Sequence, residues 1–179
     1  MKILKKITIV LAILVSVIII LIYDRIDRNQ VYSIATTNEE LKTFFLHKTS
    51  EEQEKAYESN FGNEKYEFPR DKVAKIKLYK NVFLISRITS KKISESNEIK
   101  LTNFFNNPEN FSWGETTWNV EEAEYILRFF DENENEIGKI WICIDGCYMS
   151  KSIPFSPNMK YGGLSKIGRE KIKDFLNDY

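Results

Sequence analysis

Residues 7–23, ITIVLAILVSVIIILIY, are apolar throughout except for one threonine and one serine. A helix of about 17 such residues, each rising about 1.5 Å, is long enough to cross the hydrocarbon core of a bilayer. The preceding segment MKILKK contributes Lys2, Lys5 and Lys6 and no acidic residue. We therefore expect residues 7–23 to lie in a lipid bilayer as a single transmembrane helix.

Two other interpretations of this segment stay open, a cleaved secretory signal and a buried helix of a soluble domain. A secretory signal has a shorter apolar stretch of roughly 7–15 residues, with small residues at a cleavage site close behind it. Here residues 23–28, YDRIDR, follow the apolar run, and the first triplet that resembles a cleavage site is SIA at residues 33–35. These features favour an uncleaved signal-anchor over the other two interpretations.

The distribution of Lys and Arg predicts the orientation of the anchor. Three lysines precede the apolar run without an acidic residue, whereas Arg25 and Arg28 behind it alternate with Asp24 and Asp27. Basic residues close to a span favour its cytoplasmic side. We therefore expect the N-terminus inside the cytoplasmic (inner) membrane and residues 24–179 outside it, as a periplasmic domain.

Composition and periodicity divide the chain into four expected parts. These are a cytoplasmic tip and transmembrane anchor at 1–23, a linker at 24–36, a helical segment at 37–69 and an α+β extracytoplasmic domain at 70–179. The portion beyond the anchor is large enough to bury a core of its own.

Two Thr-x-x-Glu capping boxes mark the helical segment, Thr37 with Glu40 and Thr49 with Glu52. In such a box the hydroxyl and the carboxylate satisfy free backbone N–H groups at the start of a helix. We expect one helix to begin at each box and the second to stop near Gly62.

From residue 73 the pattern changes to the alternation that is typical of strands. EYILRFFD and IGKIWICI flank the polar turn ENENE, which is a strong hairpin signal. Isolated helices are expected too, one capped by Ser96 with Ile99 turned inward, and a C-terminal one capped by Ser165. Strands without regular βαβ alternation indicate an α+β fold, a mainly antiparallel sheet packed by the C-terminal helix. The expected strands are VAKIKLY (73–79), VFLISRI (82–88), EYILRFFD (124–131), IGKIWICI (137–144) and CYMSKSI (147–153), and the apolar stripe of the C-terminal helix is Leu164, Ile167, Ile172, Phe175 and Leu176.

The charge balance excludes one class of partner. The chain has 26 basic and 26 acidic residues, and its first 23 positions hold three lysines and no acidic residue. The remainder therefore carries 23 basic against 26 acidic residues, a net charge of −3. Proteins that bind nucleic acid need a clustered excess of Lys and Arg, so we expect no nucleic-acid partner.

Several packing and turn motifs follow one another between residues 73 and 176. They are WGE at 113–115, Gly138 within IGKIWICI, and GGLS at 162–165 before an amphipathic helix. In this order they resemble a loose group of uncharacterised small membrane-anchored or lipoprotein-type proteins of Gram-negative bacteria. Some members of this group are similar to immunity proteins. The resemblance implies a fold and no activity, cofactor or metal.

Cys143 and Cys147 are the only cysteines, and they lie in a part of the chain that we expect in an oxidising compartment. If Asp145-Gly146 is a two-residue turn, the two side chains point to opposite faces. If residues 144–146 form a three-residue loop, they face each other at a spacing that a disulfide accepts. A disulfide, two buried thiols, and metal or redox chemistry stay open, although two cysteines alone make a poor zinc site.

Other residues with chemical potential have simpler explanations. His47 is the only histidine, so sites built on two imidazoles are excluded. Residues 131–136, DENENE, resemble the start of a calcium loop, but Glu136 and Ile142 stand where such a loop needs Gly and Glu. The glycines at 162–163 precede a helix, where a tight turn is a simpler explanation than an anion site. We expect no metal site and no cofactor.

One carboxylate cluster lies close to aromatic residues. Glu115, Glu121 and Glu122 are near Trp113 and Trp118 in the sequence. Paired carboxylates beside aromatic rings are the groups that glycosidases use, although ordered loops often have the same composition.

Three function classes therefore stay open. The favoured one is a non-enzymatic, single-pass membrane-anchored binding or interaction module, with a protein partner such as a toxin or an envelope protein. The second is an immunity protein that neutralises a secreted bacterial toxin, by analogy alone. The third is a periplasmic hydrolase with a carboxylate site near Trp113. The first is favoured because the patterns beyond the anchor are those of a scaffold and no motif specifies a reaction.

Overall fold

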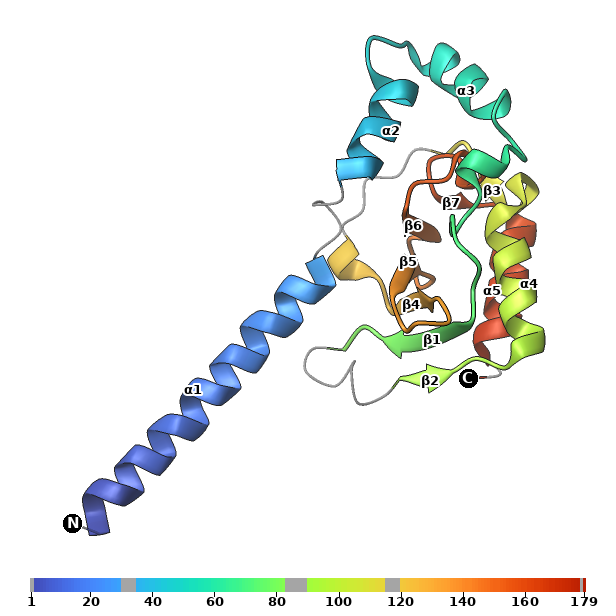
Figure 1. Cartoon of the computed structure of the whole chain (residues 1–179). Helices are drawn as coiled ribbons and strands as arrows, with labels where there is room; N and C mark the ends of the chain where they lie inside the picture. The colour runs from blue at the N-terminus through green and yellow to red at the C-terminus, as the bar shows by residue number, and fades with distance from the viewer. Residues whose placement is uncertain (1, 30–34, 83–89, 115–119, 178) are drawn as a thin grey trace. The chain divides into compact units, whose positions relative to one another are not determined.

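The chain forms two compact units in the computed structural model, Met1–Ser33 and Ile34–Tyr179. Figure 1 shows the helices and strands of each unit. The residues that the structure describes are 2–29, 35–82, 90–114, 120–177 and 179.

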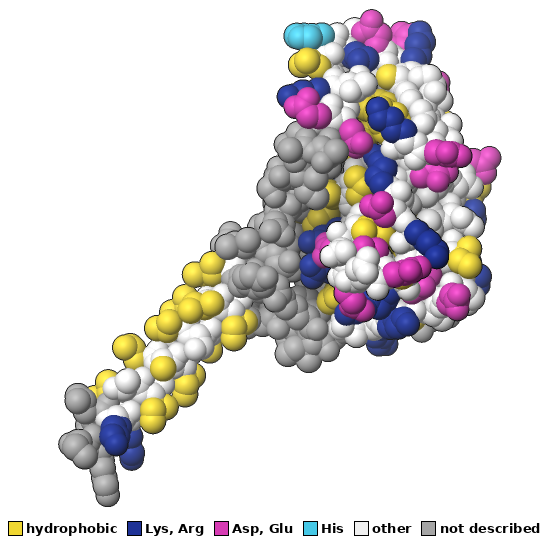
Figure 2. Space-filling model, in the orientation of Figure 1, with side chains coloured by type: hydrophobic (Ala, Val, Ile, Leu, Met, Phe, Trp, Pro, Cys, Tyr) yellow, Lys and Arg dark blue, Asp and Glu magenta, His cyan; other side chains and the backbone are white. Residues whose placement is uncertain are grey.

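The first unit is one long helix, α1 (Lys2–Asn29). Its 18 residues Lys5–Ile22 are apolar enough to cross a membrane, and none of them is buried. Figure 2 shows hydrophobic side chains distributed along the surface of this helix. Such a helix near an N-terminus fits a membrane anchor or a signal sequence. α1 continues past Tyr23, so the charged residues expected to open a linker lie in its last turns.

The second unit is built on a seven-stranded sheet, in which all pairings between the described strands are antiparallel. The strand order is β2-β1-β4-β5-β6-β7-β3. A sheet of this kind interrupted by isolated helices confirms the predicted α+β class. The strands are β1 (Lys75–Lys80), β2 (Lys91–Lys92), β3 (Phe111–Ser112), β4 (Tyr125–Phe130), β5 (Glu136–Cys143), β6 (Met149–Ile153) and β7 (Gly163–Leu164).

The hairpin of β4 and β5 forms where the sequence predicts it. The carboxylate of Asp131 accepts hydrogen bonds from the backbone N–H groups of Asn133 and Asn135, each at 2.8 Å. Glu134 supplies the positive φ, 65°, that closes the turn. The polar residues between the strands therefore fold this turn on themselves.

Two helices, α4 (Glu95–Asn106) and α5 (Lys166–Asn177), cover one face of the sheet (Figure 1). α5 begins after Ser165, as predicted, because the Ser165 Oγ accepts a hydrogen bond from the Gly168 N–H at 3.0 Å. The core between the helices and the sheet includes Phe68, Ile76, Leu78, Leu101, Phe105, Leu127, Phe129, Ile140, Ile142, Ile172 and Leu176.

Two glycines allow parts of this core to approach closely. A Cβ on Gly138 would lie 2.8 Å from the Phe68 ring, and one on Gly168 would lie 2.0 Å from the Asn110 carbonyl oxygen. Because Gly138 has no Cβ, the Phe68 ring packs directly against the backbone of β5. Because Gly168 has none, α5 packs closely against the short turn Pro108–Asn110. The chain therefore needs glycine at both positions.

Helices α2 (Ala35–Phe45) and α3 (Ser50–Glu58) precede the sheet in sequence. The Thr49–Glu52 capping box forms as predicted, with both of its hydrogen bonds present. The aromatic rings of these helices pack with rings from elsewhere in the unit, so the helical segment shares a core with the rest. The buried members of this second cluster are Phe44, Tyr57, Tyr66 and Phe155.

Some local predictions are wrong. α2 begins at Ala35, so Thr37 lies inside the helix rather than at its cap. α4 begins after Ser94, not Ser96. Ile99 is 62 % exposed, because it lies about 200° around the helix from Leu101, which faces the sheet.

The apolar stripe of α5 is correct at Ile172 and Leu176 and wrong at Ile167, which is 54 % exposed. Residues 83–88 of the expected strand VFLISRI lie outside the described residues, as do residues 115–118 of the WGETTW segment.

Candidate functional site

The loop that joins β5 to β6 contains both cysteines. Cys143 pairs directly with Met149, so five residues, 144–148, connect the strands. The loop is thus longer than either turn considered from the sequence. Positive φ angles at Gly146 (93°) and Tyr148 (50°) turn the chain back.

A disulfide joins Cys143 and Cys147 across this loop, with their Cα atoms 5.7 Å apart. Cys143 is 2 % exposed at the end of β5, and Cys147 is half-buried. The residues at the tip of the loop, Asp145 and Gly146, are exposed.

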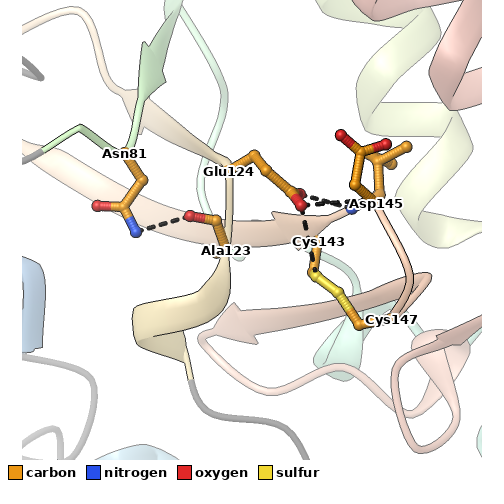
Figure 3. Close-up of a disulfide and its surroundings, with 7 residues drawn as sticks. Asn81, Ala123, Glu124, Cys143, Asp145 and Cys147 are labelled. Atoms are coloured by element: carbon orange, nitrogen blue, oxygen red, sulfur yellow. Dashed lines mark hydrogen bonds between the residues drawn. A yellow bond between two sulfur atoms is a disulfide. The ribbon is translucent and has the colours of Figure 1, made fainter.

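The side chain of Glu124 lies beside the disulfide and contacts the same loop (Figure 3). Its carboxylate accepts hydrogen bonds from two consecutive backbone N–H groups, those of Ile144 at 2.6 Å and Asp145 at 3.1 Å. Both residues lie beyond the last pair of the β5–β6 ladder. The carboxylate therefore binds two N–H groups at the point where the ladder ends.

Asn81, which follows β1, holds Glu124 in place. The Asn81 backbone N–H donates to the Glu124 carbonyl oxygen at 2.7 Å, and the Asn81 side-chain amide donates to the Ala123 carbonyl oxygen at 2.8 Å. Figure 3 shows Asn81 and the disulfide on either side of Glu124. Glu124 thus connects the end of β1, through its backbone carbonyl, to the loop after β5, through its carboxylate.

The ligand atoms of Glu124, Cys143 and Cys147 lie within 4.8 Å of one another, close enough to hold a metal ion. Metal binding by cysteine requires thiolates, and here the two sulfurs are bonded to each other. Both carboxylate oxygens are also engaged by N–H groups. This donor set therefore does not fit a metal in the oxidised form.

Tyr148 connects the loop to α5. The guanidinium carbon of Arg169 lies 4.1 Å from the centre of the Tyr148 ring, and the Lys173 ammonium lies 5.0 Å from it. The Tyr148 carbonyl oxygen accepts from the Leu164 N–H at 2.8 Å. Cation–π contacts and a backbone hydrogen bond thus hold the base of the loop.

Trp113 lies half-buried in the second aromatic cluster. Its ring centre is 5.5 Å from that of Tyr57 and 5.2 Å from that of Tyr161. The Lys160 ammonium lies 5.4 Å from the Trp113 ring centre. Burial lowers the pKa of Lys160 and raises the pKa of Tyr57, as expected for ionisable groups among aromatic rings.

The carboxylate site near Trp113 stays a prediction. Glu122 is exposed in the short turn Val120–Glu122. Glu115 and Trp118, and the side chain of Glu121, lie outside the part of the chain that the structure describes.

The remaining candidates belong to turns. His47 is exposed with a φ of 60°, after α2. The calcium-like segment is the β4–β5 turn, in which Asp131 binds N–H groups. Gly162 has a φ of 92°, and a Cβ there would lie 2.1 Å from the Ser150 carbonyl oxygen. The glycine pair therefore serves a close backbone approach.

A groove of about 1070 Å³ lies beside α4 and the segment 67–74. Two of its charged groups are engaged in the fold. The Glu98 carboxylate, which is 8 % exposed, accepts from the Ile76 N–H at 3.0 Å. Arg70 donates to Glu40 at 3.0 Å and to the Phe155 carbonyl oxygen at 2.6 Å. In this groove, the charges of Glu98 and Arg70 therefore stabilise the fold through hydrogen bonds within the protein.

No family model, curated protein or solved structure matches this chain.

Sequence reasoning missed Glu124 and Glu98, whose carboxylates bind backbone N–H groups far away in the sequence. Glu124 directly precedes β4, and Glu98 lies in the first turns of α4. The surrounding sequence resembles that of any exposed acidic residue, and the partner N–H groups are about 20 residues away. Only the strand register could have identified either contact.

Proposed function

We propose that this chain is a membrane-anchored binding module without enzymatic activity, in which residues 7–23 cross the inner membrane and the folded unit works outside the cytoplasm. The observation that carries the proposal is α1, whose segment Lys5–Ile22 is apolar enough to cross a membrane and is not buried among the residues that the structure describes. Apolar surface in water costs about 25 cal/mol per Å², so a helix of this kind is stabilised by a bilayer.

The disulfide supports the extracytoplasmic side. Bonds between cysteines persist in oxidising compartments and are rare in the cytosol. Cys143 and Cys147 are joined at the end of β5. The lysines before the apolar run 7–23 favour the same orientation.

The loop 144–148 supports a binding role. The disulfide, the Glu124 carboxylate and the contacts of Tyr148 hold it at three points, while Asp145 and Gly146 remain exposed at its tip. A loop that is already ordered loses little conformational entropy on binding. A protein, such as a toxin or an envelope protein, is the kind of partner proposed.

The topology test uses the full chain with a C-terminal reporter. Fusion to a phosphatase that is active only outside the cytoplasm should give activity, and fusion to a fluorescent protein that matures only in the cytoplasm should stay dark. The protein should resist alkaline carbonate extraction and dissolve in detergent. The matched variant Leu14→Arg/Ile18→Arg places two charges in the span and should reduce both membrane retention and phosphatase activity. A soluble or N-terminally shortened wild-type product would contradict the anchor.

A further inference from the structure

Four basic residues lie directly opposite one another across four neighbouring strands of the sheet. Lys92 of β2 pairs with Lys77 of β1, Lys77 pairs with Arg128 of β4, and Arg128 pairs with Lys139 of β5. Opposed residues point to the same face, and adjacent strands are about 4.8 Å apart. We call these four residues the basic row.

A row of like charges is unfavourable unless anions compensate it, since directly opposed like charges destabilise a sheet. Glu136 compensates the β5 end. Its carboxylate accepts from the Arg128 Nε at 2.6 Å and lies 3.4 Å from the Lys139 ammonium. That end of the row is therefore neutralised within the fold.

The β2 end of the row is compensated in part by the Glu134 carboxylate, which pairs with Lys75 and whose pKa is lowered by Lys75 and, to a smaller extent, by Lys77. Among the residues that the structure describes, neither Lys77 nor Lys92 forms an ion pair. Lys77 is half-buried, with its ammonium 5.2 Å from the Phe130 ring centre, and Lys92 is exposed. β2 is an edge strand of the sheet, so this end of the row lies at the sheet edge. Two aligned cations stand there although the chain beyond residue 23 has a net charge of −3.

We propose that Lys77 and Lys92 bind the phosphate groups of anionic lipids in the membrane that holds the anchor. Charge complementarity supports this occupant, because lysines close to an anionic bilayer are attracted to its surface. The proposal deepens the proposed function and depends on its membrane anchor.

The test uses the full chain in lipid nanodiscs of two compositions, phosphatidylcholine alone and an equal mixture with phosphatidylglycerol. Lysine acylation by an N-hydroxysuccinimide ester is followed by mass spectrometry. Lys77 and Lys92 should react at least about twofold more slowly in anionic discs. Added sodium chloride at 0.5 M should restore their rates, because salt screens the attraction between the lysines and the lipid phosphates. The Debye length falls from about 10 Å at 0.1 M salt to about 3 Å at 1 M.

Two lysines serve as internal controls. Lys42 and Lys55 are exposed and lie 2.6 Å and 2.7 Å from Glu39 and Glu51, and their rates should be the same in both discs. The variant Lys92→Gln should bring the acylation rate of Lys77 in anionic discs closer to its rate in neutral discs.

The outcomes separate this inference from the proposed function. A protein that does not elute with the discs contradicts the anchor itself. A protein that elutes with them but shows equal rates at Lys77 and Lys92 contradicts only the lipid contact. Protection in neutral discs on adding inorganic phosphate, without an effect of anionic lipid, indicates a free anion and also contradicts it. Equally slow acylation of Lys77 and Lys92 in both kinds of disc indicates a contact within the protein and also contradicts the lipid contact.

Discussion

The carboxylate of Glu98 accepts a hydrogen bond from the backbone N–H of Ile76 at a position where the edge strand has already ended. β2 pairs with β1 only at Lys77 and Leu78, and after Ile93 the chain turns into α4. The side chain of Glu98, which belongs to α4, accepts the hydrogen bond from β1 in place of a backbone carbonyl of β2. A buried N–H group is thereby satisfied.

Replacing Glu98 with Ala should lower the free energy of unfolding by about 1–3 kcal/mol, because the Ile76 N–H loses its acceptor inside the protein. Glu98→Gln keeps a carbonyl acceptor and should cost less. Urea denaturation of the detergent-solubilised chain, followed by tryptophan fluorescence, measures both. Glu95→Ala, an exposed change in the same helix, is the control. Equal effects of Glu98→Ala and Glu95→Ala would show that the contact does not stabilise the fold.

The variant Glu124→Ala should free the loop after β5 while the disulfide stays intact. Amide hydrogen exchange at Ile144 and Asp145 should accelerate about tenfold, the factor for a hydrogen bond worth about 1.4 kcal/mol. Exchange with fragment-level mass spectrometry reports it. Glu122→Ala, two positions earlier and exposed, should leave both rates unchanged. Unchanged exchange in Glu124→Ala would contradict the role assigned to this carboxylate.

The two cysteines should be unreactive in the unfolded protein until a reductant is added. Maleimide labelling in denaturant should give no adduct before reduction and two after it. Because the bond closes a very short loop, its removal should cost an amount at the low end of the range of about 0–5 kcal/mol. Cys143→Ser serves as the control, since it should leave one thiol that is labelled without reduction. Two adducts on the unreduced wild type would exclude the disulfide.

On α5, the cost of truncation should follow burial. Ile172 is 1 % exposed, so Ile172→Ala should lose about 2–5 kcal/mol. Phe175 is half-buried, and its loss should fall below the roughly 3–5 kcal/mol that a fully buried ring gives. Ile167→Ala is the exposed control and should change stability by less than about 0.5 kcal/mol. Equilibrium urea unfolding ranks the three, and an equal loss in all of them would mean that α5 does not pack through the observed face.

The turn between β4 and β5 should contribute to acid sensitivity. The side-chain amide of Asn135 and backbone N–H groups donate to Asp131 and hold the pKa of its carboxyl below the ordinary value. A carboxyl whose pKa is lowered by folding stabilises the folded state above its unfolded-state pKa of about 3.9 and loses that contribution as the pH falls through the folded value. Asp131→Asn should therefore be less stable near pH 6 and lose less between about pH 4 and 2. Unfolding measured at each pH tests this, with Glu132→Gln as the exposed control. A parallel loss in wild type and Asp131→Asn would contradict it.

Features governed by neighbours in sequence could be predicted. The Thr49–Glu52 box, the Ser165 cap and the β4–β5 hairpin each form among residues a few positions apart. The prediction of which helix residues are buried was partly wrong, because an exposed isoleucine fits an apolar pattern as well as a buried one does. Ile99 and Ile167 are both cases of this.

Features that depend on strand register could not be predicted. The sequence leaves open a turn at 145–146 or a loop at 144–146, but Tyr148 also adopts a positive φ, and the loop extends over 144–148. The basic row likewise exists only because of the pairings between strands. Lys77 is 51 positions from Arg128 in the sequence, and no local pattern relates the two.

The main core draws its residues from Phe68 to Leu176, with α5 closing one face of the sheet. During biosynthesis, the apolar segment of α1 leaves the ribosome first, long before the last residues of this core exist. The sheet therefore lacks its covering helix while most of the chain is being made. In the proposed topology, the polypeptide crosses the membrane before this core is complete, and the folded unit assembles only on the far side.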